Sequence, residues 1–213
     1  MKRVLRFAVG GLIVLLASGW ANQQEASLPL GLGLVSPRTR DLEALRFYGP
    51  ENLSQVADML APTDSVTFVR GPNQIDIATA PPYLVPEVLK LDYDMLYFRA
   101  TTVSRNWIEI VVNQRTGQTA WVDRHSVDLI YWPEFLSQVY AVEVVDQESN
   151  PLRIKPLGHA SVVTRTTEPL RPLAVNGHWI LVETIETPPR DTKSGWIRWR
   201  DGDTLLITYS ILS

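Results

Sequence analysis

Cysteine is absent from all 213 residues of the chain. Its absence excludes disulfide bonds, a thiol nucleophile, cysteine metal sites and a lipid-bearing cysteine, so the fold must be held by core burial alone. Histidine is scarce, with three residues, and neither an H-E-x-x-H nor a G-x-S-x-G motif occurs. With so few candidate catalytic groups, we expect a protein that is not an enzyme.

Positive charge is also in short supply. Lysine and arginine total 20 against 23 aspartates and glutamates, which gives a net charge of -3. The longest basic clusters, Arg38-Thr-Arg40 and Arg198-Trp-Arg200, are too small for a phosphate-binding surface, so we expect no nucleic-acid partner. The acid pairs Asp92-Tyr-Asp94 and Asp201-Gly-Asp203 lack the other ligands of a calcium loop, so we expect no metal and no cofactor.

Only the N-terminus carries an extended apolar run. A basic start precedes Phe7–Ala17, and the small residues Gly19 and Ala21 follow it. This pattern predicts a secretory signal peptide over residues 1–21, with an uncleaved N-terminal anchor as the alternative. The run is too short for a comfortable membrane span. We therefore expect a periplasmic or extracellular protein that is not a lipoprotein and has no integral span once the signal is removed.

The rest of the chain is broken into short segments, as its fifteen prolines and twelve glycines suggest. Residues 22–40 mix Gly, Pro and Ser with scattered leucines, which favours a linker or a loosely attached arm. A short helix or turn is expected over 53–60. Strands at intervals of about ten residues predict an all-β protein. The expected strands are 44–48, 65–69, 75–79, 96–101, 107–113, 119–123, 139–145, 161–164, 173–175, 179–185, 195–199 and 205–209.

One pattern occurs twice. Asn106-Trp-Ile-Glu-Ile-Val matches His178-Trp-Ile-Leu-Val-Glu, and after a polar hairpin Ala120-Trp-Val matches Gly195-Trp-Ile. A closing apolar run follows each copy. Upstream, Phe47-Tyr-Gly-Pro pairs more weakly with Arg153-Ile-Lys-Pro. These matches predict one structural unit used twice.

The second copy resembles the bacterial SH3-like domains, whose signature is G-x-W-x-x-V, a hairpin and then G-W-[IV]. Gly177-His-Trp-Ile-Leu-Val182 and Gly195-Trp-Ile197 carry it, and the resemblance extends over about 138–213. The first copy matches only over 105–132, has Ala120 in place of the glycine and follows a long lead-in. The resemblance implies two small SH3-like β-barrels in tandem with few short helices, one over 41–137 and one over 138–213, in a cell-envelope protein that binds cell-wall peptides or protein partners.

Tryptophans are the main candidate site residues. Trp107, Trp121, Trp179 and Trp196 recur at equivalent positions, so we expect core or inter-strand packing for them and no ligand contact. Trp199 has no counterpart in the first copy, where Arg124 stands. It is expected either to line a groove or to pack the two domains together. Since arginine binds carboxylates well, the predicted ligand-binding residues are Trp199, Arg198 and Arg200.

Three functions remain open on these residues. The first is a non-catalytic secreted or periplasmic module that recognises an extended peptide, a cell-wall component or an envelope protein. The second is a structural or assembly subunit of an envelope complex that uses its aromatic surface as an interface. The third is an enzyme with a site built from carboxylates such as Glu109 and Asp123, the latter near His125, although no spacing supports it.

Overall fold

A computed structural model describes residues 28–50, 54–72, 74–185 and 192–213, so the predicted signal peptide over 1–21 lies outside the described residues. The prediction of an all-β fold is confirmed, because antiparallel strands dominate and α1 (Trp132–Leu136) is the one α-helix of the described part. Within the same ranges, no helix has the length and apolar character needed to traverse a bilayer.

The first half forms a six-stranded sheet and a three-stranded sheet. The larger has the order β8-β7-β6-β1-β9, with β5 also paired to β6, and the smaller has the order β2-β3-β4. Short 3-10 turns lie at Ala57–Met59, Leu91–Tyr93 and Arg124–Ser126. The strands are β1 (Gly33–Pro37), β2 (Ala44–Phe47), β3 (Asp64–Arg70), β4 (Ile75–Thr79), β5 (Val88–Lys90), β6 (Met95–Val103), β7 (Trp107–Asn113), β8 (Gln118–Asp123) and β9 (Val127–Tyr131).

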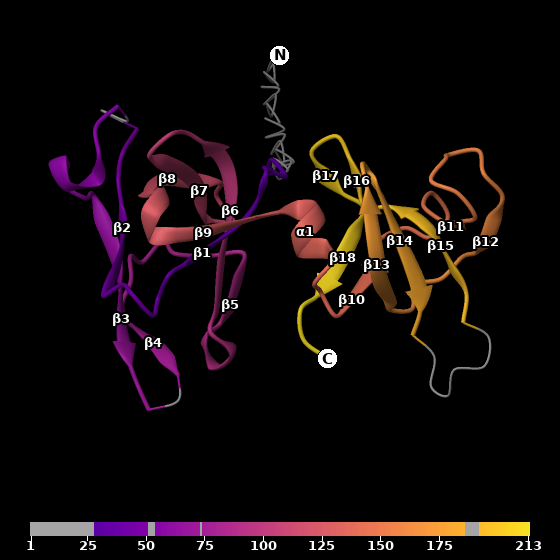
Figure 1. The fold of residues 1–213 in the computed structure, drawn as a ribbon, viewed down its shortest axis with the longest axis horizontal. Coiled ribbons are helices and arrows are strands. Elements are labelled where there is room, and N and C mark those ends of the chain that lie inside the picture. Colours follow the sequence, from indigo (N-terminus) through magenta and orange to yellow (C-terminus); the bar gives the residue numbers. More distant parts are fainter. Residues whose placement is uncertain (1–27, 51–53, 73, 186–191) are drawn as a thin grey trace, which may run out of the picture.

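The second half forms a seven-stranded sheet with the order β12-β11-β15-β14-β13-β10-β18 and a small ribbon, β16-β17. Figure 1 shows the two halves on either side of α1. The strands are β10 (Ala141–Val144), β11 (Leu152–Arg153), β12 (Val162–Thr164), β13 (Leu170–Asn176), β14 (Trp179–Thr184), β15 (Ser194–Arg198), β16 (Arg200–Asp201), β17 (Thr204–Leu205) and β18 (Ile207–Ser210).

The two halves repeat one topology. In chain order β1, β6, β7, β8 and β9 correspond to β10, β13, β14, β15 and β18, and both sets have the same spatial order. We call residues 33–131 the first repeat and residues 141–210 the second repeat. Tyr48 lies opposite Trp121 as Arg153 lies opposite Trp196. The weak upstream match is therefore displaced by one residue, because Tyr48, and not Phe47, corresponds to Arg153.

The prediction that residues 22–40 form a linker is wrong over β1. This strand pairs with both β6 and β9, and Leu34 and Val35 are fully buried. Gly33 is needed for close approach, because a Cβ there would lie 2.1 Å from the carbonyl oxygen of Ile130. The first repeat therefore starts before residue 41, the predicted beginning of the N-terminal domain.

β1 also connects two hydrophobic cores. Val35 packs in the core of the first repeat, whereas Leu34, on the opposite face, packs in the core of the second. Leu30 joins Leu34 there, and α1 adds Trp132 and Phe135. Trp132 donates a hydrogen bond from Nε1 to the Leu30 carbonyl at 2.9 Å. The repeats therefore meet across a buried apolar junction.

Candidate functional site

Trp199 lies inside the junction between the repeats. It is 2% exposed, and its Nε1 donates to the carbonyl of Gly177 at 2.8 Å. Its ring centroid lies 6.5 Å from that of Trp132. The prediction that Trp199 binds ligand is therefore wrong, and the alternative, that it packs the domains together, describes its position. The reason is strand alternation, which puts Ile197 and Trp199 on the core side.

The two predicted arginines are engaged within the protein. Arg198 pairs with Asp201 at 2.7 Å. The side-chain amide of the buried Asn150 donates from Nδ2 to the Arg198 carbonyl at 2.7 Å and accepts at Oδ1 from the Arg198 N–H at 2.9 Å. The Arg200 guanidinium lies over the Trp199 ring, 5.1 Å from its centroid, and contacts His178 Nε2 at 3.1 Å. The structure thus brings Arg200 and Trp199 together as packing, while Arg198 points to the opposite, outer face of β15.

The four repeated tryptophans do not share one environment. Trp107 is fully buried, but Trp121, Trp179 and Trp196 are partly exposed and none of the three packs in either core. A core position is therefore wrong for these three, whereas the alternative of inter-strand packing fits Trp121 and Trp196, which lie opposite Glu109 and Leu181 on neighbouring strands. In the second repeat the core takes Ile180, Val182 and Ile197, so alternation turns Trp179 and Trp196 outward.

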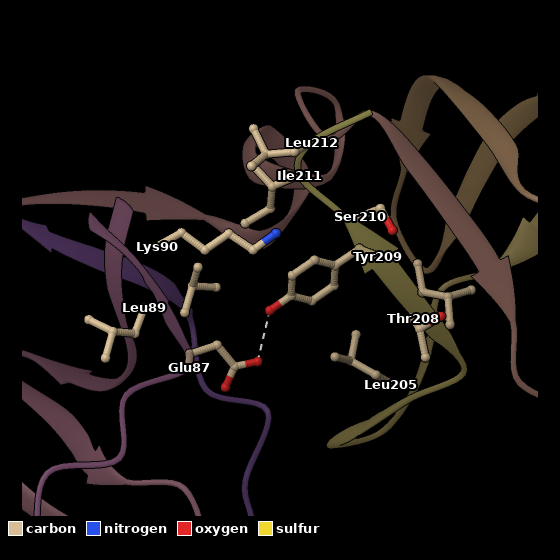
Figure 2. A pocket seen from close by; sticks show the side chains of 11 residues that line it. Glu87, Leu89, Lys90, Leu205, Thr208, Tyr209, Ser210, Ile211 and Leu212 are labelled. Atoms are coloured by element: carbon tan, nitrogen blue, oxygen red, sulfur yellow. Dashed lines mark hydrogen bonds between the residues drawn. The ribbon is translucent and has the colours of Figure 1, made fainter. Parts of the chain in front are cut away.

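A groove of about 530 Å³ lies between the two repeats, bordered by β5 on one side and by β18 and the residues after it on the other. Its lining is mainly aliphatic and also includes Glu87, Lys90 and Tyr209. β18 is the last strand of its sheet, and β5 pairs with β6 alone among the described strands. The groove therefore runs between two terminal strands, one from each repeat. Figure 2 shows this arrangement.

A polar bridge closes the floor of the groove. Tyr209 donates its hydroxyl hydrogen to Glu87 at 2.8 Å, as Figure 2 shows, and Arg99 donates to both oxygens of the same carboxylate, at 2.9 and 3.1 Å. Burial raises the pKa of Tyr209 above its ordinary range, and the negative charge of Glu87 raises it further. The hydroxyl therefore stays a hydrogen-bond donor, and the charge of Glu87 is already balanced by Arg99.

Lys90 is the remaining charged group of the groove. It is exposed, and no ion pair involves it within the described residues. Figure 2 shows its side chain extended over the groove towards β18. The groove thus offers aliphatic side chains, two strand edges and one ammonium group.

Sequence reasoning missed the groove residues for two reasons. Lys90 ends a three-residue strand that follows a proline-rich stretch, and Glu87 lies immediately before that strand; so short a strand shows no usable alternation. Tyr209 was expected only as part of a closing strand, and it meets Glu87 across 122 residues of chain.

The residues considered for catalysis take part in local hydrogen bonds. Asp123 accepts a hydrogen bond from the backbone N–H of His125 at 3.1 Å, which stabilises the 3-10 turn. Glu109 accepts hydrogen bonds from Thr101, Thr102 and Thr119. In the part of the chain that the structure describes, no three His, Asp or Glu side chains are grouped so that they could hold a metal ion.

Comparisons with known proteins give little further information. No protein-family model matches the chain, and neither does any curated protein. Among solved structures, NlpC1 from Trichomonas vaginalis matches with 10% sequence identity and a TM-score of 0.31. The match covers 88% of this chain and 49% of that chain, so this chain spans about half the length of that protein. At this TM-score the likeness carries no argument.

Proposed function

We propose that the chain is a non-catalytic binding protein of the cell envelope, built from two SH3-like domains, that holds an extended peptide in the groove between them. The fold assignment is supported by the Gly177–Val182 and Gly195–Ile197 motifs and by the strand order common to both repeats. The signal-like residues 1–21 support export to the periplasm or beyond.

The groove between β5 and β18 carries the proposal. Terminal strands present unpaired backbone groups, and an extended peptide can add to them as a further strand. The volume of about 530 Å³ lies within the range of about 300–1,000 Å³ that small-ligand sites occupy. Val88, Leu89 and Ile211 supply apolar contact for side chains of the peptide.

The charges of the groove favour a ligand with a carboxylate. Because Arg99 and Tyr209 already satisfy Glu87, the open charge is the ammonium of Lys90. An extended peptide with a free carboxylate, such as the stem peptide of a cell wall, would place that group against Lys90. The apolar walls would then contact the small side chains of the peptide.

A titration of the protein with a soluble cell-wall stem tetrapeptide, followed by NMR, tests the proposal. We expect shifts in the amide signals of β5 and β18, and binding about tenfold weaker after Lys90→Glu. Lys155→Glu is the matched control, because Lys155 is also exposed but lies away from the groove.

Two results would contradict this function. One is saturable binding that Lys90→Glu and Lys155→Glu weaken equally, which would place the peptide elsewhere. The other is hydrolysis of peptidoglycan or of a peptide substrate by the purified protein, with loss of the activity on His125→Ala.

The junction favours a second candidate, a structural or assembly subunit of an envelope complex. Trp132, Phe135 and Tyr209 form mutual ring contacts with centroids 5.0–6.1 Å apart, edge-on at Phe135 and tilted between Trp132 and Tyr209, and these contacts join α1 to β18. A shared core of this kind fixes two domains relative to each other, as a spacer in an assembly requires. Loss of the stem-peptide binding, together with stable capture of an envelope protein that Trp179→Ala does not affect, would favour this candidate.

A further inference from the structure

The two repeats begin the same hairpin with the same residue. Trp107 pairs with Asp123 in the first repeat, and Trp179 pairs with Arg198 in the second. The neighbouring pairs, Ile108 with Val122 and Ile180 with Ile197, both face a core. The two tryptophans therefore occupy equivalent positions on the outer face of the hairpin.

In the first repeat the chain covers this outer face itself. The connection between β2 and β3, residues 48–63, brings the Gln55 carbonyl to within 3.0 Å of Trp107 Nε1. Tyr48 lies edge-on against the same ring, with centroids 4.9 Å apart. Trp107 is consequently 0% exposed, although it lies outside the core cluster.

In the second repeat the corresponding cover is missing among the described residues. The connection between β11 and β12, residues 154–161, is shorter, and Trp179 Nε1 has no hydrogen-bond partner in the described chain. Leu181 lies opposite Trp196 on the same face, and all three side chains are partly exposed. We call Trp179, Leu181 and Trp196, with the flanking Arg153 and Arg198, the outer face of the second repeat.

The two faces differ in charge, because the first carries Glu109 and Asp123 where the second has Leu181 and Arg198. The first-repeat position of Arg198 is held by Asp123, and that of Arg153 by Tyr48. Within the described residues, Arg198 forms an exposed ion pair with Asp201, and Arg153 donates a hydrogen bond from Nη1 to the Ala160 carbonyl at 2.7 Å. Exposed ion pairs are weak, so an outside carboxylate can compete with Asp201 for Arg198. Arg153 is partly exposed and keeps further N–H groups for such a carboxylate beside its bond to Ala160.

We propose that the outer face of the second repeat docks an acidic polypeptide segment of a partner protein, which takes the place that residues 54–57 take in the first repeat. The segment supplies a backbone carbonyl to Trp179 Nε1 and apolar contact to Leu181 and Trp196. Its carboxylates lie against Arg153 and Arg198. This surface is distinct from the groove at β5 and β18, so it does not depend on the function proposed above.

A peptide with the chain's own sequence Phe47–Leu60 is a suitable probe, because part of that segment covers the equivalent tryptophan and its only charged residues are Glu51 and Asp58. Binding to the intact protein is measured by isothermal titration calorimetry. We expect saturable binding that weakens about tenfold or more with Trp179→Ala and with Arg198→Glu. The same peptide with Glu51→Gln and Asp58→Asn is expected to bind more weakly than the acidic one.

Matched controls separate docking from unfolding. Trp179 and Arg198 lie outside both cores, so the variants keep the fold, which circular dichroism checks. Lys90→Glu is expected to leave this binding unchanged. The proposal is overturned if the peptide does not bind, or if Trp179→Ala and Arg198→Glu bind it as the original protein does. It is also overturned if sedimentation in the analytical ultracentrifuge shows a dimer of the original protein and a monomer of Trp179→Ala, because a second copy of the chain would then occupy the face.

Discussion

The first repeat encloses Trp107, whereas the second leaves Trp179 partly exposed at the same place in the same hairpin. The strands of the two hairpins are equivalent, with Ile108 and Ile180 both facing a core. The difference comes from the connecting segments. The connection between β2 and β3 accepts a hydrogen bond from Trp107 at Gln55, whereas no such bond joins the shorter connection between β11 and β12 to Trp179 in the described residues. Equivalent strands therefore produce a structural tryptophan or a surface tryptophan according to the loop beside them.

A second difference concerns the first strand of each repeat. β1 is buried on both faces because each face meets a different core, while β10 exposes Glu143 in the usual alternation. The first strand of the first repeat is therefore a component of both domains. The two repeats therefore share a fold, but the first strand of the first repeat uses one face for its own core and the other face for the interface with the second repeat.

Replacement of Trp107 and of Trp179 by alanine should change stability by the most different amounts. Trp107→Ala removes a fully buried ring and a hydrogen bond, and should lower the free energy of unfolding by ~3–5 kcal/mol. Trp179→Ala removes a partly exposed ring outside the core, and should cost less than about 1 kcal/mol. Urea denaturation measures both. Similar losses for the two variants would mean that the second face is covered as well.

Breaking the bridge between the repeats should have the next largest effect. Glu87→Gln leaves the Arg99 guanidinium, 13% exposed, without its carboxylate and should cost about 3 kcal/mol. The control is Asp128→Asn, which removes an exposed pair with Arg38 and should cost no more than ~1 kcal/mol. If Glu87→Gln and Asp128→Asn both lowered the free energy of unfolding by the same small amount, the junction between the repeats would be solvated.

The burial of β1 predicts a smaller but distinctive effect. Gly33→Ala forces a Cβ against the Ile130 carbonyl and should lower the free energy of unfolding by ~1–3 kcal/mol. Gly158→Ala in the second repeat is the matched control, because a Cβ there meets nothing within 4 Å. If Gly33→Ala is as stable as Gly158→Ala, β1 does not lie against β9.

The smallest effect is a pH dependence within the first repeat. Burial, with a contribution from the hydrogen bond to Asp64, raises the pKa of Tyr83 from 10.0 to about 12. The unfolded chain ionises its tyrosine first, so the stability that Tyr83 contributes is complete below pH 10 and declines towards pH 12. Tyr83→Phe should therefore lose less stability than the original protein between pH 10 and pH 12, and thermal denaturation over this pH range measures the difference. An unchanged slope would place Tyr83 in open solvent.

Much of the fold could be predicted from local patterns, because alternation identified β4 and β7 with their full bounds and the repeat identified the equivalent hairpins. β1 could not be predicted in this way. A strand buried on both faces has no alternation, and Gly33 suggests flexibility where it provides close approach.

The candidate site was predicted less well than the fold. Alternation puts Trp199 and Trp196 on opposite faces of one strand, but it does not reveal which face meets a core. That depends on Trp132, which approaches Trp199 from the preceding helix. The β5–β18 groove depends on residues far apart in the chain, and such long-range pairings leave no local signal.

Tryptophan footprinting of the intact protein tests the central claim most directly. An oxidising reagent is applied under native conditions, and mass spectrometry of the digest reports the modification of each tryptophan. We expect Trp179 and Trp196 to react readily, because both are partly exposed, and we expect Trp107, Trp132 and Trp199 to be protected. Equal reactivity of Trp107 and Trp179, whether both high or both low, would contradict the claim that the first repeat covers the face that the second leaves open.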